Sequence, residues 1–283
     1  MTAPGRRGLI AALLIALPVL VGLGYSLLAS LGLAGPGARG FATGRLLAVL
    51  AEPAVWRGVL WSLGVATVST LLATAGAVGV SVLFRGPSRS HRFARLLALV
   101  PLPIPHLAAA VAGLLILGQS GLLSRVAATA GWIDGPGGMP ALVYDRLGVG
   151  LSLTLAWKEF PFLALVAFSV LATRGAALEE VARSLGAPPS AVFRRVTWPL
   201  LWRGLLPAVI AVFVFVFSTY EATAVLAPSD PLALPLLTLE RYTDADVGRR
   251  GDAFVLVLVG MAVSLLAVAF HEWTRSRWER LHR

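Results

Sequence analysis

The chain of 283 residues is too apolar for a soluble domain, because 57% of its residues are hydrophobic, 13% are charged and its mean hydropathy is +0.81. It contains no cysteine, which excludes a disulfide framework and a thiolate metal site. The net charge of +10 would suggest nucleic acid in a soluble protein, but here the basic residues report membrane topology and no nucleic-acid partner is expected. Apolar runs of about 20 residues, enough to cross a bilayer, recur along the chain and predict an all-α membrane protein.

Six of these runs are predicted to be membrane-spanning helices. They occupy residues 9–31, 56–84, 106–117, 147–172, 205–227 and 253–270. The segments between them, apart from the one that joins the fourth and fifth spans, are predicted to be loops: 35–53, 85–95, 119–146 and 228–252. The first run could alternatively be a cleaved signal peptide, but it is longer than a typical signal sequence and more spans follow it.

The third span is interrupted at its start by prolines. Pro101, Pro103 and Pro105 disfavour regular helix, so the clean part of the span is expected to begin at His106. Residues 96–105 must then cover part of the membrane depth while packed on protein, because irregular backbone is not viable against lipid. His106 itself is interpreted as a helix-end or interfacial histidine rather than a ligand.

The fourth and fifth spans contain charged residues. Lys158 and Glu159 are followed by Pro161, which we expect to interrupt the fourth span. Charges inside a span are costly and usually face a cavity or a partner group. Lys158, Glu159, Tyr220 and Glu221 are therefore candidates for the wall of a translocation pathway. The alternative is a structural pair that ties the fourth span to Glu221 or to Arg57, and the sequence leaves both open.

The distribution of basic residues indicates the orientation of the chain. Six spans place both termini on one side, and 15 of the 24 basic residues lie in the N-terminal segment, in 85–95, in 173–203 and in 271–283. Only 8 lie in the segments on the other side. By the positive-inside rule, both termini and residues 173–203 are predicted to be cytoplasmic, in a multi-pass protein of the cell membrane.

No signature of a catalytic site is found. HExxH and GxSxG are absent and the four histidines are scattered, so we expect neither an enzyme nor a metal site. A P-loop needs a lysine after its glycines, but the only lysine is Lys158, in AWKEF. The chain is therefore not expected to bind ATP through a P-loop.

Residues 179–199, EEVARSLGAPPSAVFRRVTWP, are the one long segment in which charge, glycine and proline interrupt the apolar sequence. An apolar stripe at helical spacing runs along its first half: Leu178, Val181, Ala182 and Leu185. Gly186 is predicted to close this helix in the left-handed conformation, and Pro188 and Pro189 can begin a second one. The segment is expected to form a helix, a sharp corner and another helix.

This segment resembles the cytoplasmic signature loop of the membrane subunits of binding-protein-dependent ABC importers. The family pattern is a glutamate, two small residues, three variable positions and a glycine, then nine variable residues, an aliphatic, a variable position, a hydrophobic residue and a proline. The matching residues are Glu180, Ala182, Gly186, Val196, Trp198 and Pro199. Val181 stands where alanine is usual and Trp198 where leucine is usual. The resemblance extends to PLPIPHLAAAVAGL, WKEFPF and STYEATAVLAPSDPLALP and covers roughly residues 56–270.

The resemblance implies the type I ABC importer permease fold, with a coupling helix that docks in a groove of a separate ATPase. Glu180 would face a basic group of that ATPase, and Gly186 would make the turn. Arg194, Arg195 and Pro199 would anchor the return to the fifth span. The implied coupling residues are Glu179, Glu180, Ala182, Arg183, Gly186, Ala187, Arg194, Arg195 and Pro199.

The resemblance also implies partners. These are a second membrane subunit, identical or related, ABC ATPase subunits that use ATP and Mg²⁺, an extracytoplasmic solute-binding protein and the lipid bilayer. No cofactor is expected on this chain. The WKEFPF element and the prolines after the fifth span are most similar to the branch for thiamine, ferric iron, polyamines, aminoethylphosphonate or related small charged solutes. Half of a translocation pathway for such a small solute is the implied function.

The expected organisation has three parts: residues 1–54 with the first span and an outer loop, 55–272 as the permease core with its coupling loop at about 174–203, and 273–283 as a basic cytoplasmic tail. A second hypothesis is a secondary transporter or channel that is driven by an ion gradient through Lys158, Glu159 and Glu221. That class predicts inverted repeats with matched broken spans, and no convincing repeat is found.

Overall fold

The computed structural model describes residues 6–281 except 39 and 42, so residues 1–5 of the expected N-terminal part and residues 282–283 of the expected basic tail lie outside it. The described chain forms helices and no strand. Six of its helical segments are long and apolar enough to cross a membrane, which confirms the all-α fold with six spans. They are Ile10–Ser30, Pro53–Leu83, His106–Thr129, Val149–Thr173, Pro189–Ser218 and Arg249–Arg277.

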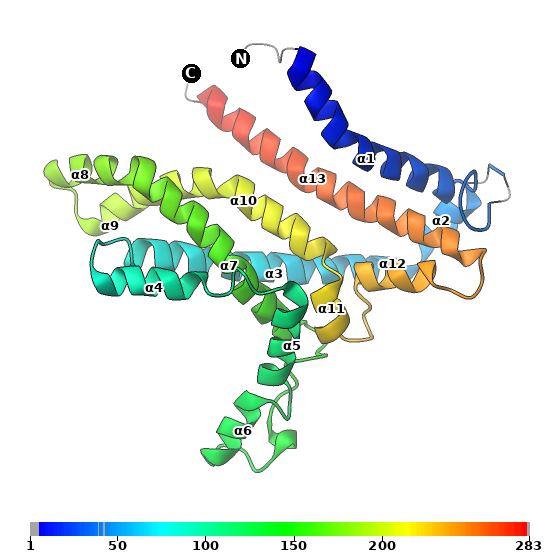
Figure 1. Ribbon diagram of the computed structural model, residues 1–283, viewed down its shortest axis with the longest axis horizontal. Helices are drawn as coiled ribbons and strands as arrows, with labels where there is room; N and C mark the ends of the chain where they lie inside the picture. The colour runs from blue at the N-terminus through cyan, green and yellow to red at the C-terminus, as the bar shows by residue number, and fades with distance from the viewer. Residues whose placement is uncertain (1–5, 39, 42, 282–283) are drawn as a thin grey trace. The chain divides into compact units, whose positions relative to one another are not determined.

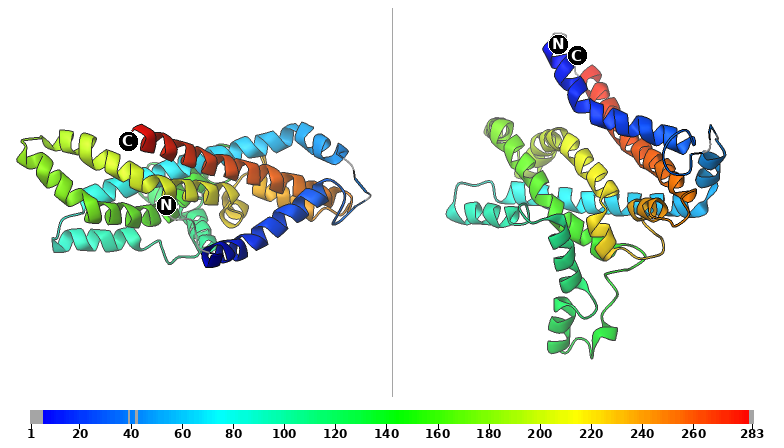
Figure 2. Two further views of the ribbon diagram at one scale, coloured as in Figure 1. Left: turned by 90° about the horizontal axis from the view of Figure 1, so that it is seen from above. Right: turned by 45° about the vertical axis from the view of Figure 1, so that its right-hand side comes forward.

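One compact unit comprises Met1–Val59 and Leu234–Leu265. Its helices are α1 (Arg6–Ser30), α2 (Gly44–Ala51), the first turns of α3 (Pro53–Leu83), α12 (Leu234–Tyr242) and the first half of α13 (Asp252–Leu281). Figures 1 and 2 show the end of α1 beside the start of α13, where the rings of Tyr25 and Phe254 meet edge to face at 5.4 Å. Aromatic contacts of this kind add to the apolar packing of two neighbouring helices.

Buried charges join the short helices of this unit. The Arg45 guanidinium donates to the carbonyl of Ala29 at 3.0 Å and lies 3.5 Å from the Asp252 carboxylate. Arg241 of α12 forms ion pairs with Glu52 and Asp252. The sequence predicted that segments 35–53 and 228–252 are loops. This prediction is wrong, because each segment contains a helix that is held by charge pairs.

The other unit comprises Leu60–Ala233 and Leu266–Arg283 and contains all the candidate functional residues. Besides most of α3 it holds these helices: α4 (Arg89–Leu99), α5 (His106–Leu117), α6 (Leu122–Thr129), α7 (Val149–Val170), α8 (Ala176–Ser184), α9 (Pro189–Val192), α10 (Trp198–Ser218) and α11 (Glu221–Leu226). A core of Ala167, Leu171, Leu201 and Leu205 joins α7 to α10, and Val78 of α3 packs against it. Figure 1 shows α8 and α9 together at one end of α7 and α10.

Several predicted boundaries in this unit are wrong. The basic loop 85–95 contains the start of α4, whose N-cap Ser88 accepts a hydrogen bond from the His91 amide. Residues 119–146 contain α6. The fourth span is not interrupted at Pro161, since α7 continues through this residue. A proline is tolerated inside a membrane helix because neighbouring helices can compensate for its missing backbone donor.

The fifth span is also displaced from its predicted range. It begins near Pro189 rather than Leu205 and its long helix ends at Ser218, where the chain becomes extended at Thr219 before α11. The predicted break before the third span is confirmed, since helix ends at Leu99 and resumes at His106 after the three prolines.

Candidate functional site

The loop between the fourth and fifth spans has the predicted form of helix, corner and helix. Gly186 has a φ of +80°, and the amides of Gly186 and Ala187 donate to the carbonyls of Arg183 and Ala182 at 2.9 and 3.1 Å. These two bonds form a Schellman motif, which closes α8 and requires the left-handed residue that glycine supplies at least cost. Pro189 then occupies the first turn of α9, where its missing amide is not needed.

Two π-helical turns flank this loop, at Leu171–Gly175 and Phe193–Thr197. Each turn joins the loop to a long span, α7 on one side and α10 on the other. Such turns are rare and occur frequently at functional sites, because each inserts a residue into the helical repeat and redirects the side chains that follow. Here the turns let the chain leave and re-enter the bundle without a long linker.

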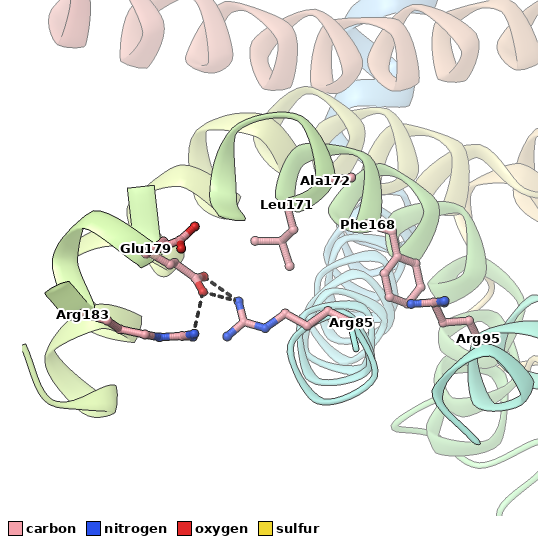
Figure 3. Close-up of a pocket in the computed structure, with 8 residues that line it drawn as sticks. Arg85, Arg95, Phe168, Leu171, Ala172, Glu179 and Arg183 are labelled. Carbon is pink, nitrogen blue, oxygen red and sulfur yellow. Dashed lines mark hydrogen bonds and ion pairs between the residues drawn. The ribbon is translucent and has the colours of Figure 1, made fainter. Parts of the chain in front are cut away.

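Glu179 is buried at the centre of a polar cluster behind α8 (Figure 3). Arg85, just beyond the end of α3, donates from Nη1 to both carboxylate oxygens at 2.5 and 2.6 Å. Arg183 donates to the same carboxylate at 3.2 Å and Thr197 donates at 2.6 Å. The Glu179 side chain is only 4% exposed. One carboxylate thus joins α8 to the end of α3 and to the turn before α10.

The Glu179 cluster makes the stability of this region depend on pH. Burial by itself raises the pKa of the Glu179 carboxyl, but hydrogen bonds from Thr197 and Arg85 and the charges of Arg85 and Arg183 outweigh burial, and the pKa is lowered. Because the pKa is lowered, the ionised Glu179 carboxylate stabilises the folded protein. This stabilisation is complete above the ordinary pKa of 4.5 and is lost as the pH falls through the lowered pKa.

We expect wild-type protein to be more stable than a Glu179→Gln variant at neutral pH, and this difference to narrow in acid. The free energy of unfolding should differ by roughly 1–3 kcal/mol, the usual contribution of hydrogen bonds to a charged acceptor. The value should lie at the low end of this range because Arg85 and Arg183 are partly solvated. Thermal unfolding of both proteins in detergent, followed from about pH 7 to about pH 3, measures the difference. A difference that stays constant over this range would contradict the assignment.

The apolar stripe of α8 faces outward. Leu178, Val181 and Leu185 are 51%, 58% and 82% exposed, whereas Glu179 on the same helix is buried. This is the reverse of an ordinary surface helix, which buries its apolar side chains and exposes its charges. Within the described chain no segment covers these three side chains, and an exposed apolar face of this kind is typical of a binding surface.

The remaining candidates of the loop differ in burial. Those on the surface are Glu180, Arg183, Arg194 and Arg195, and those that are half-buried are Ala182, Ala187 and Pro199. Glu179 and Glu180 therefore differ in environment. The first contacts the protein's own arginines, whereas the side chain of the second is exposed.

A second cluster lies inside the fourth span. Lys158 and Glu159 are 6% and 8% exposed, and Glu159 Oε1 lies 2.8 Å from His106 Nε2. Lys158 donates from Nζ to the carbonyl of Leu102 at 3.4 Å. The ring of Phe215 on α10 packs against His106 at 4.8 Å. Glu159 thus has a partner that the sequence did not suggest, His106.

This cluster complements the proline break in the third span. Leu102 lies inside the break, where backbone carbonyls lack helical partners, and Lys158 supplies a donor there. His106 is the first residue of α5, and negative charge is favourable at a helix N-terminus, where Glu159 lies. The adjacent residues of α7 therefore bind the two sides of one break, which explains how irregular backbone is tolerated at this depth.

The other two pathway candidates lie elsewhere. Tyr220 and Glu221 are exposed at the start of α11, and Glu221 occupies the first turn of that helix. The residues of the two polar clusters that the sequence did not indicate as candidates are Arg85, Thr197 and His106. They could not be predicted because the partners of all three are far away in sequence. Only His106 gave a signal, which is its position directly after the three prolines.

Comparison with known proteins agrees with this geometry. The family model described as "Binding-protein-dependent transport system inner membrane component" matches residues 75–280. The molybdenum transport system permease protein ModB of Mycobacterium tuberculosis is 30% identical over 224 residues, which cover 77% of this chain and 81% of ModB. A probable molybdenum ABC transporter permease protein of Haloferax volcanii is 29% identical over 215 residues, 76% of this chain and 74% of that protein.

A solved structure shares the fold. The crystal structure of a bacterial ABC transporter involved in the import of the acidic polysaccharide alginate contains a chain that superposes with a TM-score of 0.74 at 13% identity. The match covers 96% of this chain and 93% of that one. At this identity the likeness concerns the arrangement of the helices alone.

Proposed function

Because the chain belongs to the binding-protein-dependent transport system inner membrane components, and is thus a type I ABC importer permease in the inner membrane, we propose that it docks on its ATPase through the exposed apolar face of α8. One observation carries this proposal: Leu178, Val181 and Leu185 are exposed on a helix whose glutamate, Glu179, is buried. An apolar face with a charged neighbour, here Glu180, fits a groove that has a basic rim.

The Glu179 cluster explains how docking would move the spans. Arg85 follows α3, Thr197 precedes α10, and both are hydrogen-bonded to a carboxylate on α8. A displacement of α8 would therefore pass to two spans as a rigid-body movement rather than be absorbed by a flexible connector. The two arginines that flank Glu179 keep it ionised and bound during this movement.

The subunit composition follows from the family. One six-span chain forms half of a pathway and requires a second permease subunit, identical or related, with ATPases on the side of α8 and a binding protein on the opposite side. The excess of basic residues on the α8 side supports a cytoplasmic position for that side and for both termini. ATP and Mg²⁺ would bind the ATPase, since this chain has no P-loop lysine. ATP-driven closure of the ATPase pair would tip the spans toward outward opening.

We assign the solute to the small oxyanions, with molybdate as the first candidate. Molybdate is the form that molybdenum takes in neutral aerated water, and two relatives with about three quarters coverage of this chain are named for molybdenum transport. These relatives favour an oxyanion over thiamine, ferric iron or polyamines. The permease core would span residues 55–272, with the coupling loop at about 174–203.

The test is transport in proteoliposomes that contain the permease, its ATPase and its binding protein. We expect accumulation of molybdate that depends on ATP and on the binding protein, and that an excess of thiamine does not inhibit. Vesicles loaded with a nonhydrolysable ATP analogue provide the control. Molybdate uptake that is driven by a proton gradient without any ATPase would instead establish the secondary-transporter hypothesis. Uptake of thiamine in preference to molybdate would overturn the assignment of the solute.

A further inference from the structure

A cavity of about 810 Å³ opens behind α8, at the ends of α3 and α7. Its walls include Arg85, Arg95, Arg183, Phe168, Leu171 and Ala172, and Figure 3 shows the Arg85 side chain reaching toward Glu179 and that of Arg95 lying beside the Phe168 ring. The lining residues thus form an apolar set and a charged set, in which the three arginines are joined by Glu179 and Glu180. The coupling role proposed above uses Glu179 and the outer face of α8 and leaves this cavity without a function.

The cavity lies at the ends of two candidate membrane spans. The second span ends at Leu83, two residues before Arg85, and the fourth span ends at Thr173, directly after Ala172. Phe168, Leu171 and Ala172 therefore belong to the last turns of a candidate span, whereas Arg85 and Arg183 lie beyond the ends of the spans. The apolar wall and the cationic groups follow one another in the order of the acyl chain and the phosphate of a phospholipid.

The cationic groups are fixed in place and exceed the carboxylates. Arg95 donates from Nη1 to the carbonyls of Phe84 and Gly86 at 3.0 and 3.3 Å, and its guanidinium lies 5.9 Å from the centre of the Phe168 ring. Three arginines line the cavity against two glutamates. Each guanidinium has five donors, so even Arg85 and Arg183 retain donors beyond those that bind Glu179. Rigid guanidinium groups suit the recognition of phosphate oxygens.

The helix that contributes Arg95 is itself suited to the membrane surface. Arg89 and Arg92 of α4 are exposed at its start, and Phe93, Leu96 and Leu97 are exposed along it. A short helix with basic and large apolar side chains together is typical of an interfacial segment that lies on anionic lipid. This helix would bring the bilayer surface to the mouth of the cavity.

We propose that the cavity binds the headgroup of an anionic phospholipid, with the phosphodiester between Arg85, Arg95 and Arg183 and an acyl chain along Phe168 and Ala172. The recognised chemistry is a phosphate that carries net negative charge, and the apolar wall assigns its source to a lipid rather than to free phosphate. Because Arg85 and Arg183 also hold Glu179, a bound lipid would lie against the cluster that joins α8 to the spans. The site does not depend on ATPase docking.

Native mass spectrometry of the full-length purified chain tests this proposal, with phosphatidylglycerol, phosphatidylcholine and inorganic phosphate as probes. We expect phosphatidylglycerol to bind more tightly than phosphatidylcholine. The affinity for phosphatidylglycerol should fall about fivefold when one arginine contact is lost in Arg95→Gln. Since Arg95 also holds backbone carbonyls, Ala172→Glu provides a second variant, which places a repelling charge on the exposed wall without removing a contact. Ser184→Glu, exposed on α8 outside the cavity, adds the same charge and should leave the affinity unchanged.

Three results would overturn the proposal. The first is equal affinity for phosphatidylglycerol and phosphatidylcholine. The second is equal affinity for phosphatidylglycerol in the Ala172→Glu and Ser184→Glu variants. The third is displacement of the lipid by millimolar inorganic phosphate, which would assign the cavity to a free anion. The proposal is supported if the wild type prefers phosphatidylglycerol to phosphatidylcholine and if Arg95→Gln and Ala172→Glu, but not Ser184→Glu, bind phosphatidylglycerol more weakly.

Discussion

Leu185→Asp is expected to prevent the permease from binding its ATPase while leaving the permease itself as stable as wild type. Leu185 is 82% exposed, so the chain's own fold gains little from this side chain. In the complex the same position would be buried, and an unpaired carboxylate in an apolar groove is costly. A central apolar anchor contributes about 2 kcal/mol or more, so affinity should fall at least roughly thirtyfold. Copurification of the ATPase with tagged permease measures this loss.

A matched control separates docking from folding in this experiment. Val247 is also an exposed apolar residue, 48% exposed, but it lies in the segment after α12 on the side opposite to α8 in the proposed topology. Val247→Asp should leave ATPase binding unchanged. Full ATPase binding by Leu185→Asp, with normal levels of both proteins, would remove the docking role from this face.

Glu159→Leu is expected to lower the stability of the protein by about 3 kcal/mol, because it removes one partner of a buried polar pair inside a span. Glu159 is 8% exposed, and its loss leaves His106 without the acceptor 2.8 Å away. The same change removes a negative charge from the first turn of α5 and leaves the break before it less well held. Thermal unfolding in detergent, monitored by circular dichroism, measures the effect.

A double-mutant cycle shows whether the effect belongs to the pair. When His106→Leu accompanies Glu159→Leu, both polar groups are replaced by apolar ones of similar size, and much of the lost stability should return. A Ser184→Leu variant, at an exposed position outside the bundle, should unfold like wild type. If the double variant instead lost as much stability as the two single variants together, the two side chains would act independently. The contact between them would then not hold the break.

The local chemistry of the chain was readable from sequence wherever the deciding interaction is short-range. Gly186 closes α8 as expected, because a Schellman motif depends on a glycine and on amides within five residues. The break before His106 was equally clear, since each of three prolines acts on its own neighbours. The C-terminal end of the fifth span was not readable, because uninterrupted apolar composition says little about whether Thr219 continues a helix or leaves it.

The partners of the charged residues could not be predicted for a related reason. Glu179 and Glu180 are adjacent and chemically alike, and the resemblance treats both as coupling residues, yet one is buried and the other exposed. Arg85, which decides this, is 94 positions away from Glu179. His106 likewise reaches Glu159 across 53 positions. A sequence pattern records which residue types are present but not which of two neighbouring side chains turns inward.

The sequence by itself determined that this is a six-span α-helical membrane protein with a helix, corner and helix between its fourth and fifth spans, because hydropathy, glycine and proline act locally. Only the tertiary structure decided that the apolar stripe of this helix faces outward while Glu179 is held inside by Arg85 and Thr197. The direction in which an amphipathic helix faces depends on what packs behind it. Here that is a set of two arginines and one hydroxyl, which stabilise a buried carboxylate and leave the apolar face exposed.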